Sequence, residues 1–301
     1  PEEPAALAMA VEKAIETDAE LVMASDPDAD RVGAAVKNNE GEWVLLNGNQ
    51  TALMFVYYLI TRWKELGKIN GKEYIVKTIV TTETIKTIAE RNGVEMYDVY
   101  TGFKWIANVM RENEGKKNYI GGGEESYGFL CEDFVRDKDA VSACVILAEI
   151  AAWAKDQGLS LYQLLQKIYV EYGFSKEKGI SVVKKGKSGA EEIEAMMKKF
   201  RENPLTEIAG SKVTYFYDYS TLKGKDYAEN ETVTLDMPTT SNVLQYFTED
   251  NTKVSIRPSG TEPKIKFYCE VHSKVKNIDE LPEAEKAAEE KINQIKASLG
   301  I

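Results

Sequence analysis

The sequence has one histidine and three cysteines, and this scarcity excludes several kinds of site. A single histidine, His272, cannot form the histidine pair of a metal-binding motif, and a catalytic triad would depend on it alone. Cys131, Cys144 and Cys269 show no paired spacing and no Cys-x-x-Cys motif. An odd number of cysteines without a disulfide framework is typical of a reducing compartment, so we expect a cytoplasmic protein.

Long hydrophobic runs and an excess of basic residues are also missing. The most apolar stretch, residues 52–60, is far shorter than the ~20 residues of a membrane-spanning helix. Lysine and arginine number 38 against 49 aspartates and glutamates, a net charge of −11 that disfavours a general nucleic-acid surface. We therefore expect neither a membrane nor a nucleic-acid partner. Because the first residue is proline, we expect a piece of a longer chain, whose targeting signals cannot be judged from this end.

A dense acidic segment stands out at residues 26–31, which read DPDADR. Asp26, Asp28 and Asp30 alternate with uncharged residues, and apolar runs on both sides predict a strand before and after them. The segment thus lies at a strand end, where open α/β sheets bind ligands. Alternating carboxylates can converge on Mg²⁺, which prefers oxygen ligands, and Arg31 offers a fork of donors suited to phosphate. On spacing alone, a solvated turn is an equal alternative, because Asp and Pro are common in turns.

Three more segments bring polar side chains to predicted strand ends or helix starts. Residues 121–126 read GGGEES, and glycines let the backbone approach a ligand or turn tightly. Two carboxylates there suit a polyol, although an ordinary turn with surface glutamates is the alternative. Residues 101–104 end a strand and open a helix, and simple capping of that helix by Thr101 is the alternative to a ligand-binding role. Residues 136–139 read RDKD and open another predicted helix.

Residues 257–263 read RPSGTEP and lie between two predicted strands, so they form a hairpin loop. Gly260 permits a positive φ, and Ser259 and Thr261 offer hydroxyls. Successive amide groups in such a loop form an anion nest, and Arg257 adds a bidentate donor. A tight turn with an incidental arginine is the alternative. The loop is not a P-loop, because no Gly-Lys-Ser/Thr follows.

Hydrophobic periodicity changes near residue 173, which suggests that the 301 residues form more than one domain. Before it, strands alternate with helices, as in an α/β fold with a parallel sheet flanked by helices. The strands predicted there are 20–24, 32–36, 43–46, 74–80, 94–100 and 119–120, and the helices are 4–17, 49–66, 82–91, 103–111, 137–155 and 159–170. The helix at 137–155 carries an apolar stripe formed by Val141, Val145, Ala148 and Ala152.

After residue 173 several strands have a period of two, which predicts an α+β domain with an antiparallel sheet. The clearest is 264–272, where alternate residues are apolar. The other strands are predicted at 180–184, 213–217, 232–236, 243–247 and 253–256, and the helices at 190–201 and 283–299.

Three of these loops resemble loops of one known family. Residues 26–31 resemble the metal loop of the α-D-phosphohexomutases, the phosphoglucomutase and phosphomannomutase family. Residues 123–128 (GEESYG) resemble its sugar-binding loop, and residues 257–263 its phosphate-binding loop. The three matches follow the family's order over nearly the whole chain.

The resemblance implies domain boundaries and roles for individual residues. Residues 1–47 would be the end of domain 2 with the metal loop, residues 48–173 the sugar-binding domain 3, and residues 174–301 the phosphate-binding domain 4. The implied Mg²⁺ ligands are Asp26, Asp28 and Asp30; the sugar-phosphate ligands are Thr101, Gly102, Glu124, Ser126 and Lys138; the phosphate ligands are Arg257, Ser259, Gly260 and Thr261. Arg31 and Lys138 would support catalysis.

The family moves a phosphoryl group between two hydroxyls of one sugar, through an enzyme phosphoserine and a bisphosphate intermediate. That serine lies in a Ser-His-Asn context, and no Ser-His occurs in this chain. The resemblance therefore implies the C-terminal part of a mutase, inactive by itself, with Mg²⁺ and glucose 1,6-bisphosphate as cofactors of the whole.

The sugar loop indicates which phosphosugar to expect as the small-molecule partner. Its Glu-Glu-Ser form resembles glucose- and pentose-type members more than the dual mannose/glucose ones, which favours a phosphoglucomutase acting on glucose 1-phosphate and glucose 6-phosphate. Phosphopentomutase, phosphomannomutase and a non-catalytic phosphosugar-binding module are the alternatives. The sequence does not indicate an oligomeric state.

Overall fold

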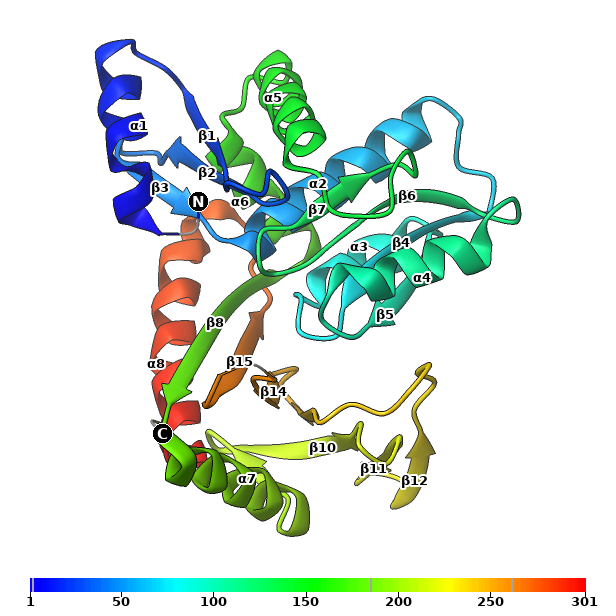
Figure 1. Cartoon of the computed structure of the whole chain (residues 1–301). Helices are drawn as coiled ribbons and strands as arrows, with labels where there is room; N and C mark the ends of the chain where they lie inside the picture. Colours follow the sequence, from blue (N-terminus) through cyan, green and yellow to red (C-terminus); the bar gives the residue numbers. More distant parts are fainter. Residues whose placement is uncertain (2, 185, 261) are drawn as a thin grey trace. The chain divides into compact units, whose positions relative to one another are not determined.

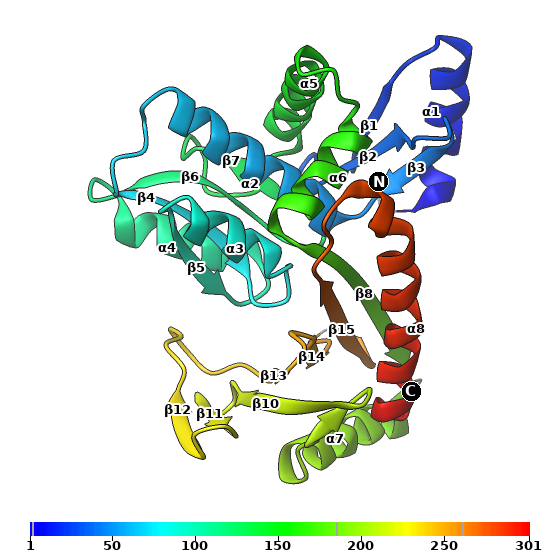
Figure 2. The same cartoon turned by 180° about the vertical axis from the view of Figure 1, so that it is seen from behind.

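The computed structural model describes residues 1, 3–184, 186–260 and 262–301 (Figures 1 and 2). The chain divides into two compact units, Pro1–Gly173 and Phe174–Ile301. Among the described residues, no helix is both long enough and apolar enough to span a bilayer.

The first unit begins with a small antiparallel sheet of three strands in the order β1-β2-β3. Helix α1 packs on it, and Leu7 and Ala14 of the helix meet Val22 and Ala35 of the sheet. The second and third predicted strands pair as an antiparallel hairpin. The bounds are α1 (Pro4–Glu16), β1 (Leu21–Ser25), β2 (Val32–Lys37) and β3 (Trp43–Leu46).

The rest of this unit is an α/β layer with a second sheet in the order β5-β4-β6-β7. Strand β4 pairs in parallel with both β5 and β6, whereas β7 is antiparallel to β6. The predicted α/β class is confirmed, but the sheet is mixed. The bounds are α2 (Gly48–Glu65), β4 (Glu73–Thr78), α3 (Thr84–Arg91), β5 (Glu95–Val99), α4 (Phe103–Asn113), β6 (Asn118–Gly123), β7 (Phe129–Cys131), α5 (Ala140–Asp156) and α6 (Leu161–Tyr172).

Alternate residues of β4 face opposite sides of this sheet, and helices lie on both sides, as Figure 1 shows. Tyr74 and Val76 belong to a core cluster with Phe103, Ile106 and Met110 of α4. Helix α2 packs against β6, where a Cβ added to Gly121 would lie 3.1 Å from Leu59. All three glycines of the run belong to strand β6 rather than to a loop, and their lack of side chains permits close packing.

Helix α5 differs from its prediction in its start and in its buried face. It begins at Ala140 rather than at residue 137, because Asp139 caps it by accepting hydrogen bonds from the amides of Val141 and Ser142. The predicted apolar stripe is largely exposed, with Val141 at 66% and Val145 at 63%. The buried face consists of Ala140, Ala143, Leu147, Ile150 and Ala154.

The second unit is built on an antiparallel sheet in the order β12-β11-β10-β13-β14-β15-β8, with β9 paired to β10. The predicted α+β class is confirmed. Strand β11 was not predicted, because its sequence, Lys-Gly-Lys-Asp, has no apolar alternation. The bounds are β8 (Phe174–Val183), α7 (Gly186–Glu202), β9 (Glu207–Ile208), β10 (Ser211–Asp218), β11 (Lys223–Asp226), β12 (Glu231–Thr234), β13 (Leu244–Thr248), β14 (Lys253–Pro258), β15 (Lys264–Ser273), the 3₁₀ turn η1 (Ile278–Glu280) and α8 (Leu281–Leu299).

Strand β15 alternates as predicted, and helices α7 and α8 both pack against it. Its buried apolar residues are Ile265, Phe267, Cys269 and Val271. On the alternate positions, buried Glu270 forms ion pairs with Lys253 (3.0 Å) and with His272 (2.7 Å). Burial lowers the pKa of His272, but the Glu270 carboxylate more than offsets this, so the pKa is raised.

Candidate functional site

The acidic segment forms the loop of the β1–β2 hairpin, between the two strands that the apolar runs predicted. Strand β1 ends at Ser25 and β2 begins at Val32, and these two residues are paired. Two backbone bonds close the loop: the Asp26 amide donates to the Arg31 carbonyl (3.2 Å) and the Ala29 amide to the Asp26 carbonyl (3.0 Å). Ala29 has φ +56°, which makes the turn tight.

Asp26 is the buried anchor of this loop. Its Oδ1 accepts from the amides of Asp30 and Arg31 (3.1 Å each), and its Oδ2 accepts from Arg31 Nε (2.7 Å). Burial raises the pKa of Asp26, but the bonds from Arg31 and Asp30 outweigh it and lower the pKa to about 2. The carboxylate therefore stays charged and fixes Arg31 against the loop.

Asp30 links the acidic loop to Lys138. Its Oδ2 lies 2.7 Å from Lys138 Nζ, while Oδ1 is buried, accepts no hydrogen bond from any described residue and lies 3.6 Å from Arg31 Nε. Burial lowers the pKa of Lys138, but the bond from Asp30 outweighs it, so the pKa is raised and the ammonium is retained. Asp28 is exposed.

The oxygen donors suit a hard divalent cation, and the Asp30 oxygen without a hydrogen bond is one open ligand. A cation held by all three aspartates would have to take Asp26 from Arg31 and Asp30 from Lys138. Among the described residues, no three acidic, histidine or cysteine side chains are already gathered as a metal site.

The acidic loop and the 123–128 loop lie against each other. The Val32 amide donates to the Tyr127 carbonyl (3.1 Å), and Arg31 forms an isolated β-bridge with Gly128. Gly128 is needed there, because an added Cβ would lie 2.5 Å from Lys138 Cδ. The Ala140 amide also donates to the Ala29 carbonyl (3.0 Å). Three predicted segments therefore meet at one place: the acidic loop, the 123–128 loop with its Glu-Glu-Ser sequence, and the segment that contains Lys138.

Glu124 joins a fourth predicted segment to this site. It is 5% exposed, and its Oε1 accepts from the Gly102 amide at 2.7 Å. Burial raises the pKa of Glu124, partly offset by the Gly102 bond. Gly102 has φ +110° and is itself the N-cap residue of α4, which has no side-chain cap bond among the described residues, so the alternative of capping by Thr101 is not observed. Ser126 is exposed.

A glycine that sequence reasoning missed lets the Glu-Glu-Ser loop approach helix α2. A Cβ added to Gly48, the first residue of α2, would lie 2.0 Å from the Glu125 carbonyl oxygen and 2.8 Å from the Tyr127 amide nitrogen. Both neighbours are backbone atoms, so they cannot move aside as the end of a flexible side chain could. The sequence offered no signal for this contact, because Gly48 lies far from the loop along the chain.

We expect Gly48→Ala to lower the free energy of unfolding by about 1–3 kcal/mol, the usual range for overpacking. A loss of stability would be informative, because replacing glycine with alanine in a helix ordinarily stabilises it. Gly179→Ala is the matched control, since a Cβ there meets nothing within 4 Å and Gly179 has no left-handed φ. Chemical denaturation of the two variants measures the difference, and equal midpoints would contradict the contact.

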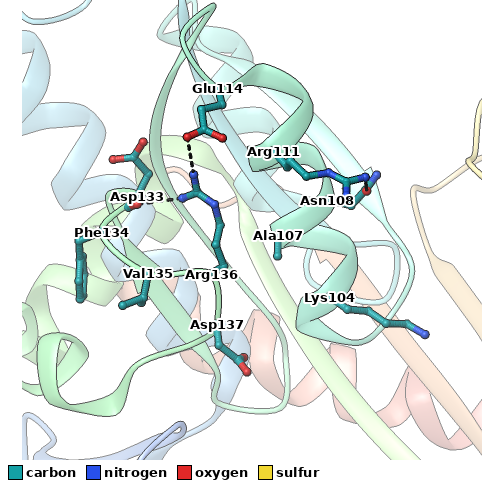
Figure 3. A pocket seen from close by; sticks show the side chains of 10 residues that line it. All are labelled: Lys104, Ala107, Asn108, Arg111, Glu114, Asp133, Phe134, Val135, Arg136 and Asp137. Atoms are coloured by element: carbon teal, nitrogen blue, oxygen red, sulfur yellow. Dashed lines mark hydrogen bonds and ion pairs between the residues drawn. The ribbon is translucent and has the colours of Figure 1, made fainter.

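A pocket of about 740 Å³ lies between α4 and the segment before Lys138 (Figure 3). Its cations do not converge: Lys104 and Arg111 point away from Arg136 in Figure 3. Arg136 instead pairs with Glu114 at 3.6 Å and donates to the Asp133 carbonyl at 2.8 Å. The pocket borders the candidate site but presents no cluster of donors for an anion.

In the second unit, residues 257–263 join β14 to β15 as the predicted hairpin. The Ser259 amide donates to the Lys264 carbonyl (2.8 Å) and closes the loop. Arg257 lies directly opposite Lys266 in the β14–β15 register. Gly260 is exposed and has no left-handed φ, so the positive φ that the sequence suggested for it is not observed. Thr261 lies outside the described residues.

Two family models match the chain. One, described as phosphoglucomutase/phosphomannomutase, alpha/beta/alpha domain III, matches residues 47–172. The other, the phosphoglucomutase/phosphomannomutase C-terminal domain, matches residues 182–288.

Individual relatives agree with these models. The phosphoglucomutase of Staphylococcus aureus strain USA300 is 38% identical over 281 residues, which are 93% of this chain and 50% of that protein. The phosphoglucomutase of Staphylococcus haemolyticus is 34% identical over 272 residues, 90% of this chain and 48% of that protein. The chain thus spans about half the length of the curated relatives it matches.

Solved structures share the fold. A phosphoglucomutase/phosphomannomutase family protein from Burkholderia thailandensis superposes with a TM-score of 0.61 at 18% identity, over 99% of this chain and 51% of that chain. The open form of parafusin, a phosphoglucomutase from Paramecium, gives 0.57 at 18% identity, over 86% and 41%. With both family models matched in order and the fold shared, the chain belongs to the phosphoglucomutase/phosphomannomutase family, the α-D-phosphohexomutases.

Proposed function

We propose that this chain is the sugar- and phosphate-binding half of a phosphoglucomutase that interconverts glucose 1-phosphate and glucose 6-phosphate. The observation that carries the proposal is the meeting of three loops, in which Asp30 pairs with Lys138 at 2.7 Å beside the Glu124 loop. A buried carboxylate, a retained ammonium and an acidic hairpin at one place suit a polyol that carries phosphate.

Each part of the site has a proposed task. Glu124 accepts hydrogen bonds from sugar hydroxyls, the Ser126 hydroxyl can donate to them or accept from them, and the Thr101–Gly102 backbone lies close to the sugar. Lys138 offers its ammonium to the substrate's phosphate or to a hydroxyl that is gaining charge. Because its partner Asp30 is also a proposed metal ligand, Lys138 can move to substrate when that aspartate is engaged elsewhere.

The proposed cation is Mg²⁺, held by Asp26, Asp28 and Asp30. When bound, it supplies positive charge to the phosphoryl group on the enzyme's serine, which we place in another part of the complete protein. Arg31 forms a 2.7 Å ion pair with Asp26, and we propose that its guanidinium binds phosphate when the cation takes over that aspartate. Positioning and charge stabilisation carry most of the rate enhancement in phosphoryl transfer, so these residues need not form covalent bonds.

The C-terminal hairpin would hold the phosphate that is not being transferred. Arg257 and Lys266 are direct cross-strand neighbours, and like charges in that position destabilise a sheet unless an anion lies near them. We propose that Arg257, Ser259, Gly260 and Thr261 bind this phosphate. With glucose 1,6-bisphosphate as the intermediate, the same loop would accept either phosphate in turn, because phosphate oxygens are nearly equivalent.

We further propose the division into residues 1–47, 48–173 and 174–301, and a cytoplasmic location. The location is supported by cysteines that are all free, two of them buried.

The test is a coupled assay of the complete protein that carries this chain, with Mg²⁺ and glucose 1,6-bisphosphate, on the 1-phosphates of glucose, mannose and ribose. We expect glucose 1-phosphate to give the highest kcat/KM. Asp28→Ala is expected to abolish the Mg²⁺-dependent rate while the protein stays folded, because Asp28 is exposed and has no structural partner to lose among the described residues. No turnover of any sugar phosphate by the wild-type protein would leave only a binding module.

A further inference from the structure

The two adjacent glutamates of the sugar loop point to different partners. Glu124 bonds to the Gly102 amide, as described above. Glu125 turns toward the end of β4, where its Oε2 lies 3.0 Å from Thr78 Oγ1 and 3.3 Å from Thr81 Oγ1. Both threonines are fully buried, at 0% exposure. Nothing in the family resemblance assigns a role to Glu125, Thr78 or Thr81.

These groups can form a closed ring of hydrogen bonds. The Glu125 amide donates to Thr81 Oγ1 (3.2 Å), the two threonine hydroxyls are 2.8 Å apart, and Thr78 reaches the Glu125 carboxylate at 3.0 Å. If Thr81 donates to Thr78 and Thr78 donates to Glu125, two hydroxyl protons complete the ring. Such chains polarise one another in a low-dielectric interior, and a bond to a carboxylate is stronger than a neutral one.

A buried lysine connects this ring to the strand that leads to Gly102. Lys77 has a side chain that is 1% exposed, and its Nζ lies 2.6 Å from Asp98 of β5, 2.9 Å from Glu83 and 3.4 Å from the Thr81 carbonyl. Two carboxylates compensate the buried ammonium. The turn that holds Glu125 and the strand before Gly102 are thereby joined to each other.

We infer that Glu125 is a positioning residue of the sugar site, an inference that rests on the proposed function. Through Thr78 and Thr81 it fastens the 124–126 loop to the end of β4, so that the neighbouring carboxylate of Glu124 stays bonded to Gly102 and aimed at the sugar. Glu125 itself does not touch the sugar. Its contribution is to keep Glu124 in place before substrate arrives.

The test uses four single variants of the complete protein and the double variant that combines Thr78→Val with Glu124→Gln. Thr78→Val removes the hydroxyl at nearly constant shape, and Thr78→Ser keeps the hydroxyl while losing a methyl group. In the Glu124→Gln background the carboxylate of Glu124 is gone, so a change in its position can no longer affect activity. Thr84→Val is the matched control, because Thr84 is also buried but its hydroxyl makes no hydrogen bond within the described part of the chain.

Thr78→Val should lower kcat/KM for glucose 1-phosphate about tenfold, the equivalent of one lost bond to a charged group, and Thr78→Ser should restore most of it. In the Glu124→Gln background, Thr78→Val should have little further effect. Thr84→Val should match the wild type. A purely structural role of Thr78 would instead give equal losses with valine and serine, or additive losses with Glu124→Gln, and either result overturns the inference.

Amide hydrogen exchange at Gly102 separates this inference from the proposed function. Because the Gly102 amide donates to Glu124, we expect Thr78→Val to speed its exchange about tenfold and Thr84→Val to leave it unchanged. Unchanged exchange in Thr78→Val refutes the positioning role whatever the activity. Faster exchange in a protein without mutase activity supports the positioning of Glu124 and refutes the mutase assignment.

Discussion

Replacing Glu124 with glutamine in the complete protein is expected to lower kcat/KM for glucose 1-phosphate at least a hundredfold. Glu124 is 5% exposed and held by the Gly102 amide at 2.7 Å, so its carboxylate already has a fixed orientation before the proposed sugar binds. A hydrogen bond to a charged acceptor contributes about 1.5–3 kcal/mol, and two sugar hydroxyls would lose such a bond. Glutamine keeps the volume and one oxygen but loses the charge.

The control is Glu112→Gln, an exposed carboxylate on α4 that bonds only to Asn108 among the described residues. It should retain wild-type kinetics. Steady-state kinetics of both variants with glucose 1-phosphate measure the difference. A Glu124→Gln enzyme within threefold of the wild type would remove Glu124 from the sugar site.

Replacing Arg257 with alanine is expected to raise the dissociation constant for glucose 1-phosphate at least tenfold. One bidentate pair with phosphate would be lost, and a loss of about 1.4 kcal/mol already gives a factor of ten. Folding should not suffer, because Arg257 faces Lys266 across the β14–β15 pair and its removal relieves repulsion between like charges. We therefore expect an unchanged or slightly higher melting temperature.

Two comparisons make this result specific. Binding of free glucose, measured by calorimetry on the same protein, should not change, because glucose has no phosphate for Arg257 to hold. Arg257→Lys should fall between wild type and alanine, since lysine keeps the charge without the fork. Phosphosugar binding that is untouched by Arg257→Ala would reduce the hairpin to a turn.

Several local features were predictable because they depend on neighbours in sequence. The alternation in 264–272 places Ile265 and Phe267 on the buried face of β15, as observed. The loops at 26–31 and 257–263 both lie between apolar runs, and the strands on either side of each loop pair as a hairpin. Period-two patterns and turn residues depend on the local backbone conformation, so they can be interpreted without knowledge of the tertiary fold.

Features that depend on distant partners could not be predicted. Helix α5 is apolar on more than one side, so its composition does not distinguish the exposed stripe of Val141 and Val145 from the buried face of Leu147 and Ile150. Strand β7 has three residues, too few for a periodic signal, and its antiparallel pairing with β6 makes the sheet mixed.

The candidate site shows the same division. The motifs indicated which residue types form the site, but they did not indicate which of these side chains would pair with each other. Asp30 meets Lys138 because two segments more than a hundred residues apart come together, and Glu125 meets Thr78 across a separation of 47 residues. Gly48 and the threonine ring carry no motif, since their function is to hold the loop rather than to contact a ligand.

The most direct test compares this chain with the complete protein in one coupled assay for glucose 6-phosphate, with glucose 1-phosphate, Mg²⁺ and glucose 1,6-bisphosphate. If the chain holds the sugar and phosphate sites but not the phosphoryl-carrying serine, the complete protein turns over and the chain alone stays at background. Turnover by the chain alone would reveal a nucleophile within these residues and would contradict the account.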